Sequence, residues 1–213
     1  MAQRVLEALQ ERFGEAIVET HAHRGDETAR VVPERIREIC EFLKSEPSLD
    51  FNMLMDVTCV DRLHLEPSTP RFEVVYHLYS LRKKHRVRLK ARVPEEDPRL
   101  PSVVPVWKGA NWFEREVYDL YGVTFDGHPD LRRILLYPEF EGHPLRKDYP
   151  LDGEQPLVEM RDPESQRPVM PSLESNLVRS IGTPDGGRIP IGAAEATPDG
   201  ATPADAQAKE PQA

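Results

Sequence analysis

Residues 111–151 read NWFEREVYDLYGVTFDGHPDLRRILLYPEFEGHPLRKDYPL and hold the densest run of specific signals in the chain. Four apolar side chains recur there at helical spacing: Phe113, Val117, Leu120 and Tyr121. Asn111 and Glu114 have the spacing of a capping box, which predicts that the helix begins with Asn111 as its N-cap. Glycine readily adopts the left-handed backbone conformation that ends helices, so the helix is predicted to end at Gly122. The stretch therefore begins with an amphipathic helix of about three turns.

The remaining positions of this predicted helix are charged: Glu114, Arg115, Glu116 and Asp119. Such a charge density is too costly to face an apolar core without partners, so we expect these side chains to face water or another protein. Arg115 and Asp119 lie four residues apart and are expected to pair on the surface. Glu114 and Glu116 diverge by about 200° on a helix, which argues against a shared acid–base site.

Turn residues dominate after the helix, beginning with a short β-prone run at 123–125. Gly-His-Pro occurs twice in residues 127–150, a segment that we call the ribbon. Because each proline fixes the backbone angle φ directly after its turn, we expect the ribbon to be irregular but held in one conformation. Between the two turns, Arg132 and Arg133 precede an apolar run at 134–137.

The ribbon histidines allow a second interpretation. His128 and His143, together with Asp126 and Asp130, have side chains of the kind that bind metal ions. Each histidine precedes a proline in a turn, where its role is readily structural. The structural interpretation is therefore favoured over a metal site.

These residues resemble the signature of one family. The matching runs are EREVYDLYG at 114–122, Phe125, GHPDLRRIL at 127–135 and GHPLRKDYP at 142–150. In order, spacing and identity they are similar to the 30-kDa subunit of respiratory NADH-quinone oxidoreductase (complex I). The resemblance extends more loosely back to about Met1 and fades after Leu151.

The resemblance implies a structural, docking subunit of the peripheral arm of complex I. Such a subunit holds no cofactor, and the iron–sulfur clusters and FMN are expected in its neighbours. It adjoins the subunit that helps to form the quinone cavity (49-kDa-like), on the cytoplasmic side of a prokaryotic inner membrane. Oxidation of NADH by a quinone, coupled to proton translocation, would then be an activity of the complex and not of this chain alone. The equivalent subunit of a membrane-bound hydrogenase-like complex remains an alternative.

On this interpretation the charged side chains of 111–151 form a subunit interface. The candidates are Glu114, Arg115, Glu116, Asp119, His128, Asp130, Arg132, Arg133, His143, Arg146, Lys147 and Asp148. No glycine-rich phosphate loop follows a strand, and no nucleophile stands beside a base in a recognisable pattern. The sequence therefore predicts no catalytic residue.

Composition indicates one folded domain with an extension. The chain has 213 residues, 38% of them hydrophobic, which predicts a domain at 1–151 and a tail at 152–213. The tail has eleven acidic and five basic residues, so 5 − 11 = −6 of the total charge of −9 lies there. Gly, Pro, Ala, Asp and Thr dominate from about Gly182 onward, and residues 193–213 lack the large apolar side chains that offset ordering entropy, so we expect disorder there. Apolar residues scattered over 156–181 are expected to lie in a groove on a neighbour.

Composition also narrows the classes of function. Two cysteines, Cys40 and Cys59, cannot supply the four ligands of an iron–sulfur cluster or a structural zinc ion. No apolar run approaches the ~20 residues that cross a bilayer, and the first residues carry charges where a signal peptide is apolar. A net acidic chain repels nucleic acid unless a basic patch overrides the repulsion.

The residues before 111 predict an α+β fold, a mixed sheet packed by helices and followed by the tail. Helices are expected at 5–13 and from Pro33, around a strand pair at 16–19 and 29–32. A half-buried strand at 51–58 is expected, with Phe51, Met53, Met55 and Val57 sharing one face.

A hairpin is predicted from strands at 72–81 and 86–93. Its second strand alternates strictly, which places Arg86, Arg88, Lys90 and Arg92 on one face near a basic tip at 82–85. With Tyr76 and Tyr79 on the partner strand, the basic hairpin 82–92 allows a stand-alone RNA-binding module as an alternative function. No RNA-binding motif accompanies the basic hairpin, so this alternative ranks below the complex I subunit.

Overall fold

The structure is a computed structural model that describes residues 3–65 and 69–157. Its helices are α1 (Gln3–Phe13), α2 (Ile36–Ser45) and α3 (Ala110–Tyr121). Its strands are β1 (Ile17–His23), β2 (Asp26–Val31), β3 (Met53–Asp61), β4 (Phe72–Ser80), β5 (His85–Val93), β6 (Arg99–Pro101) and β7 (Thr124–Asp126). Short 3-10 turns, η1 (Gly14–Ala16) and η2 (Pro33–Arg35), precede β1 and α2.

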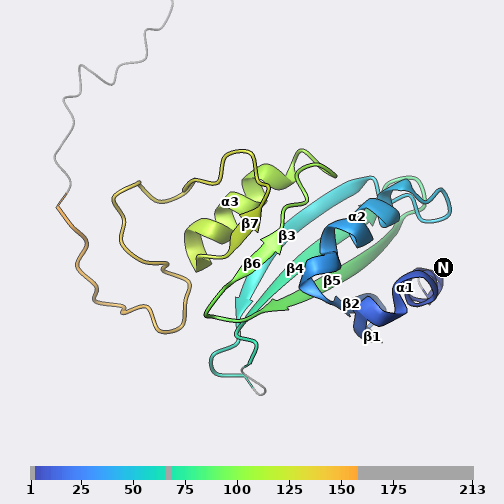
Figure 1. Cartoon of the computed structure of the whole chain (residues 1–213), viewed down its shortest axis with the longest axis horizontal. Helices are drawn as coiled ribbons and strands as arrows, with labels where there is room; N and C mark the ends of the chain where they lie inside the picture. The colour runs from blue at the N-terminus through green and yellow to red at the C-terminus, as the bar shows by residue number, and fades with distance from the viewer. Residues whose placement is uncertain (1–2, 66–68, 158–213) are drawn as a thin grey trace, which may run out of the picture. The chain divides into compact units, whose positions relative to one another are not determined.

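Five strands form a mixed sheet in the order β1-β2-β5-β4-β3 (Figure 1). Neighbouring strands are antiparallel except β2 and β5, which run parallel with Ala29 opposite Leu89. Strands β6 and β7 form a separate two-stranded parallel sheet. The predicted α+β fold, a mixed sheet packed by helices, is confirmed.

The core lies between the sheet and its helices. Alternation along β5 buries Val87, Leu89, Ala91 and Val93, as predicted. Four apolar side chains of α2 recur at helical spacing and are buried: Ile36, Ile39, Cys40 and Leu43. Because burial of each large aliphatic side chain stabilises the fold by about 1.5–3 kcal/mol, this layer holds the domain together.

The predicted face of β3 is wrong at two positions. Met53 is 39% exposed and Met55 50% exposed, whereas Leu54 and Val57 are buried. The pairing of β3 with β4 shifts register between Leu54 and Asp56. An extra residue at such a bulge reverses the alternation, so methionines counted on the buried face lie on the solvent side.

The predicted start of α3 is also wrong. The helix begins at Ala110, Gly109 is its N-cap, and no side-chain hydrogen bond caps it. Backbone bonds of the preceding turns run directly into the helix, with the amides of Ala110 and Asn111 donating to the carbonyls of Trp107 and Lys108. The predicted end is confirmed, because Gly122 has φ +77°.

The predictions for the tail concern mostly residues outside the described ones. Disorder after about 182, and the groove-bound segment up to 181, fall in this part of the chain. Among the described residues, no helix is both long enough and apolar enough to span a bilayer.

Candidate docking surface

Asp119 organises the first half of the ribbon. Its side chain is fully buried on α3, so the prediction that it faces water or a partner is wrong. Oδ2 accepts three consecutive backbone amides, from Ile134, Leu135 and Leu136, at 2.8–3.0 Å. Burial raises the pKa of Asp119, but these amides and the Arg133 guanidinium outweigh burial and hold it below its ordinary value. The carboxylate therefore fixes the apolar run of the ribbon against the helix.

Two arginines complete this attachment. Arg133 donates to Asp119 Oδ1 at 2.7 Å and to the carbonyl oxygens of Phe140 and Gly142. Arg115 donates to the carbonyl oxygens of Arg132 and Arg133, both at 3.0 Å. The predicted surface pair of Arg115 with Asp119 is therefore wrong, because both side chains bind groups of the ribbon instead.

The second half of the ribbon covers the C-terminal end of α3. The last carbonyls of a helix have no partner within it, and the helix dipole favours cations there. Here His143 Nδ1 lies 2.9 Å from the Asp119 carbonyl oxygen, and Arg146 Nε donates to that of Tyr121 at 2.7 Å. The amide of Leu145 donates to the Leu120 carbonyl. The ribbon thus caps the helix that it lies against.

Gly122 permits this close approach. A Cβ at this position would lie 2.6 Å from both the Arg146 guanidinium and the His143 ring. Its φ of +77° also disfavours other residues. A glycine is therefore required here for both the backbone turn and the room that it leaves.

A buried arginine ties the end of the ribbon to the sheet. Arg71, whose side chain is 6% exposed, binds both carboxylate oxygens of Asp61 at 2.8 and 3.0 Å. It also binds Asp148 at 2.6 Å and Glu95 at 2.5 Å. The amide of Lys147 donates to Asp61 as well. Burial raises the pKa of Asp61, but Arg71 and the amides that donate to this carboxylate outweigh burial and bring the pKa down to about 2.

Glu114 faces the interior, which contradicts the prediction that it faces water or a partner. Its carboxyl is fully buried and accepts the Ser102 hydroxyl and the Val103 amide, both at 2.7 Å. Burial raises the pKa of Glu114 to about 7, against the lowering effect of these two donors. Glu114 therefore joins α3 to the segment before it and leaves no oxygen at the surface.

The other predicted interface residues lie at the surface or in the ribbon turns. Glu116 is exposed, and Arg132 is 71% exposed with Asp130 as its ion-pair partner at 2.8 Å. His128 Nε2 lies 3.1 Å from the Asn111 carbonyl oxygen, and its Nδ1 accepts the Asp130 amide. This histidine holds its own turn, as the structural interpretation expects.

Large apolar side chains accompany these exposed charges. Trp112 is 70% exposed and Leu135 62% exposed. Trp112 lies one turn before Arg115, on the helical stripe that receives the ribbon. Exposed aromatic side chains beside charges are typical of protein interfaces.

The metal and RNA alternatives lose support. Within residues 3–65 and 69–157, no three His, Cys, Asp or Glu side chains are placed to share a metal ion. On the basic hairpin, Lys90 and Arg92 pair with Glu73, both at 2.7 Å. Tyr76 is fully buried, so it is not the exposed stacking partner that RNA binding needs.

Solved structures indicate the class of protein first. A trypsin-resistant fragment (1-134) of Nqo5 is 37% identical, with a TM-score of 0.53 over 62% of this chain and all of the fragment. A chain of the membrane-bound sulfane sulfur reductase, an archaeal respiratory membrane complex, is 27% identical, with a TM-score of 0.58 over 70% of this chain and 85% of its own. The fold is that of a subunit of respiratory complexes.

Sequence comparison then gives the family. The model of the "Respiratory-chain NADH dehydrogenase, 30 Kd subunit" family matches residues 29–155, and the chain belongs to this family. An NADH-quinone oxidoreductase subunit of Rhizobium meliloti is 47% identical over 83% of this chain and 92% of its own length. The corresponding NADH-quinone oxidoreductase subunit of Geobacter sulfurreducens is 52% identical over 68% of this chain and 87% of its own length.

Sequence reasoning missed the residues that anchor the ribbon from outside it. Arg71 and Asp61 lie 77 and 86 residues before their ribbon partners Asp148 and Lys147. No local pattern marks them, because each precedes or ends an ordinary strand. Asp61 is one of two aspartates in its strand, and the sequence does not distinguish it from Asp56.

Proposed function

We propose that this chain is a docking subunit in the peripheral arm of a proton-translocating NADH-quinone oxidoreductase. The observation that carries the proposal is the use that α3 and the ribbon make of their charges. Asp119, Arg133 and Arg146 bind groups of this same chain, which fixes the shape of the ribbon. What the fixed ribbon and α3 then present outward is a set of exposed apolar and charged side chains. That arrangement suits protein contact better than chemistry.

These contacts divide the residues of α3 and the ribbon into two groups. Asp119, Arg115, Arg133, His143 and Arg146 position the ribbon, while Trp112, Glu116, Asp130, Arg132 and Leu135 are proposed to touch the partner. The proposed partners are the quinone-cavity (49-kDa-like) subunit and the neighbours that carry iron–sulfur clusters and FMN. Electrons would pass from NADH to quinone through those neighbours, on the cytoplasmic side of the membrane. Membrane contact would occur only through the complex.

The second candidate function is the same docking role in a different respiratory complex. The likeness to a chain of the membrane-bound sulfane sulfur reductase favours it. Isolation of the complex from native membranes, with identification of the co-purifying subunits and an assay of NADH-dependent quinone reduction, distinguishes the two hosts.

The docking role predicts a loss of assembly and not of turnover. Glu116→Ala or Arg132→Ala should lower the amount of intact complex on a native gel several-fold, since a desolvated interfacial charge deprived of its partner costs about 2–5 kcal/mol. The complex that remains should keep near-normal NADH oxidation per particle. Both quantities are measured on the same membranes.

Arg99→Ala provides the matched control, because Arg99 is 61% exposed and its ion-pair partner is the neighbouring Asp97. It should leave complex abundance unchanged. Normal abundance of the Glu116 and Arg132 variants, with turnover per particle falling a hundredfold, would contradict docking and assign these residues to the chemistry.

A further inference from the structure

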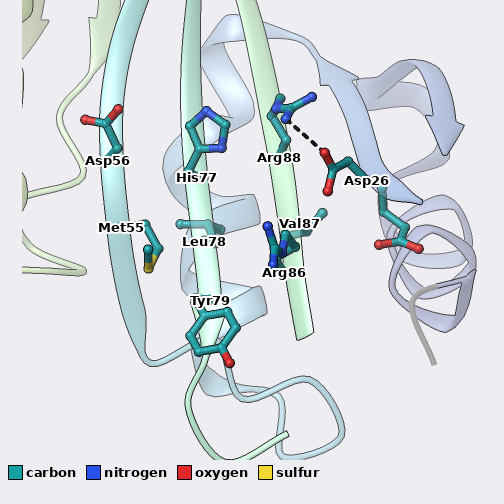
Figure 2. A pocket seen from close by; sticks show the side chains of 10 residues that line it. Asp26, Met55, Asp56, His77, Leu78, Tyr79, Arg86, Val87 and Arg88 are labelled. Carbon is teal, nitrogen blue, oxygen red and sulfur yellow. Dashed lines mark ion pairs between the residues drawn. The ribbon is translucent and has the colours of Figure 1, made fainter. Parts of the chain in front are cut away.

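Hollows of similar size in the described domain differ in their charges. The hollow on the face of the sheet, of about 420 Å³, is bordered by side chains of both signs, among them Asp26, Asp56, Arg86 and Arg88 (Figure 2). Because both signs of charge border it, charge selects no ligand there. A second hollow, of about 450 Å³, lies between the end of α2, the start of β3 and the turns before α3.

The second hollow is bordered by positive charge alone. Lys44 and Lys108 line it, and none of the described Asp and Glu side chains does. Lys44 Nζ donates to the carbonyl oxygen of Val106, and an ammonium has three donors in all. Both lysines are exposed, and within the described residues neither forms an ion pair. We call this hollow, lined by Lys44, Lys108 and Trp107, the lysine pocket.

Trp107 adds a hydrogen-bond donor to the lysine pocket. Its side chain is only 6% exposed, and among the described residues its Nε1 has no acceptor. An indole N–H can only donate, and a buried donor without an acceptor costs free energy. Lys44 Nζ lies 6.0 Å from the centre of the same ring. A ligand that presents several oxygen acceptors would satisfy the indole and the two lysines together.

The start of α3 borders the same pocket. Gly109 lines the pocket and is the N-cap of α3; no side chain caps the helix, and its first turn holds no acidic residue. The helix dipole places partial positive charge at this end, which favours an anion. A Cβ built at Gly109 would meet no described atom within 4 Å, so a ligand can approach the backbone there.

We propose that the lysine pocket binds the phosphate group of a small soluble molecule. Its oxygens pair with Lys44 and Lys108 and accept the Trp107 N–H, at the positive end of α3. Lysine is a common phosphate ligand that acts as a point charge. Two lysines also match the ~1.5–2 negative charges of a phosphate monoester at pH 7. This site is separate from the ribbon and does not rest on the ribbon's docking role.

The wall of the lysine pocket has room for the rest of the molecule. Met53, which is 39% exposed, lines the pocket together with the exposed Pro105. A volume of about 450 Å³ lies within the range of about 300–1,000 Å³ that is typical of small-molecule sites. We therefore expect a phosphate ester with an apolar group to bind more tightly than inorganic phosphate.

The test follows the indole proton of Trp107 by NMR in the full chain. Inorganic phosphate and phenyl phosphate are titrated separately at constant ionic strength. Each should shift this proton downfield to saturation, because the proton then lies in a hydrogen bond to a phosphate oxygen. Phenyl phosphate should need a ~10-fold lower concentration, since its ring is buried against the apolar wall. The indole proton of Trp112, which is 70% exposed and does not line the pocket, should not shift.

Substitutions in the pocket give matched comparisons. Lys44→Gln and Lys108→Gln should each weaken the binding of phenyl phosphate ~10-fold in calorimetry, because each removes a charge-assisted hydrogen bond. Trp107→Phe keeps an aromatic ring but removes the N–H, and should weaken binding several-fold. Lys84→Gln makes the same change of charge at an exposed position between β4 and β5 and should leave the affinity unchanged.

Several results would overturn the proposal. They are the absence of a saturable shift with phenyl phosphate, an equal shift with sodium chloride, and an affinity that neither lysine substitution alters. Vesicles that contain phosphatidic acid are tested in parallel. Binding to these vesicles that is lost in Lys44→Gln, without binding of phenyl phosphate, would place the phosphate on a lipid and overturn its assignment to a soluble molecule.

Discussion

Glu114 shows how the fold changes the chemistry of one residue. A carboxyl that is fully buried between two hydrogen-bond donors has a pKa of about 7, well above the ordinary value of 4.5. Between these two values the folded protein holds a proton that the unfolded chain releases. The free energy of unfolding must therefore fall as pH rises through this window.

Glu114→Gln should remove this pH dependence. Glutamine can accept from the Val103 amide and donate to the Ser102 hydroxyl, but it does not ionise. The variant should match the parent in stability at pH 5 and exceed it by about 2–3 kcal/mol at pH 8. Urea unfolding of the purified chain at both pH values measures the difference.

Glu116→Gln is the matched control, since Glu116 is exposed on the same helix. It should keep the pH dependence of the parent. Equal stability of parent and Glu114→Gln at pH 8 would show that the buried carboxyl does not titrate in this range.

The misassigned residues share one cause. Residue type alone predicted that Glu114 and Asp119 face outward, because a charge on a short helix is usually solvated. Their partners include backbone N–H groups of irregular segments, and nearly every residue type has such a group. No side-chain pattern announces such partners, so burial at these two positions could not be predicted from the sequence.

At the scale of elements, α3 and the ribbon form one unit. Asp119 receives three amides and one guanidinium, and the helix end receives His143 and Arg146. The helix, its terminal glycine and the paired turns were predicted correctly, because apolar periodicity and Gly and Pro are local signals. The start of α3 and the bulge in β3 were not, because both depend on backbone partners outside the element.

Asp119→Asn should release the ribbon locally. Asparagine removes the charge that pairs with Arg133, and breaking a buried pair costs about 3–5 kcal/mol. Amide hydrogen exchange at residues 134–136 should accelerate at least ~100-fold, since each 1.4 kcal/mol is tenfold. Exchange in β4 should stay slow.

Asp130→Asn serves as the comparison, because Asp130 is 57% exposed and its ion-pair partner is the exposed Arg132. In this variant, the amides of 134–136 should exchange at the parent's rate. Unchanged exchange at 134–136 in the Asp119 variant would mean that other contacts suffice to hold the ribbon.

At the scale of the whole described domain, Arg71 joins segments that are far apart in the chain. It contacts Asp61 at the end of β3, Glu95 after β5 and Asp148 in the ribbon. The strands themselves were predictable from alternation. The parallel pairing of β2 with β5 and this charge cluster were not, because both join residues far apart in sequence.

Arg71→Met should destabilise the domain and free the ribbon's end. Methionine fills similar space but leaves the buried Asp61 carboxylate unpaired, at a cost of about 3–5 kcal/mol. Urea unfolding should show the loss, and trypsin should then cut after Arg146 or Lys147. Arg71→Lys should be intermediate, since an ammonium lacks the guanidinium fork.

The same cluster sets an acid limit. The pKa of Asp61 is about 2, below its ordinary value of 3.8. The ionised carboxylate therefore makes its full contribution to the free energy of unfolding above pH 3.8, and this contribution is lost as the pH falls toward 2. The Arg71→Met variant should lose this acid dependence. Arg99→Met changes an exposed arginine and should alter neither stability nor cleavage.

The parallel pairing of β2 with β5 has a consequence for synthesis on the ribosome. Residue 93, where β5 ends, is made 62 residues after residue 31, where β2 ends. At a synthesis rate of ~5–20 residues per second, the edge of β2 that pairs with β5 stays unpaired for roughly 3–12 s. During that interval the nascent α1-β1-β2-α2 segment presents an unpaired strand edge and an apolar helix face. We therefore expect the emerging chain to bind chaperones that recognise exposed apolar segments until β5 has been made.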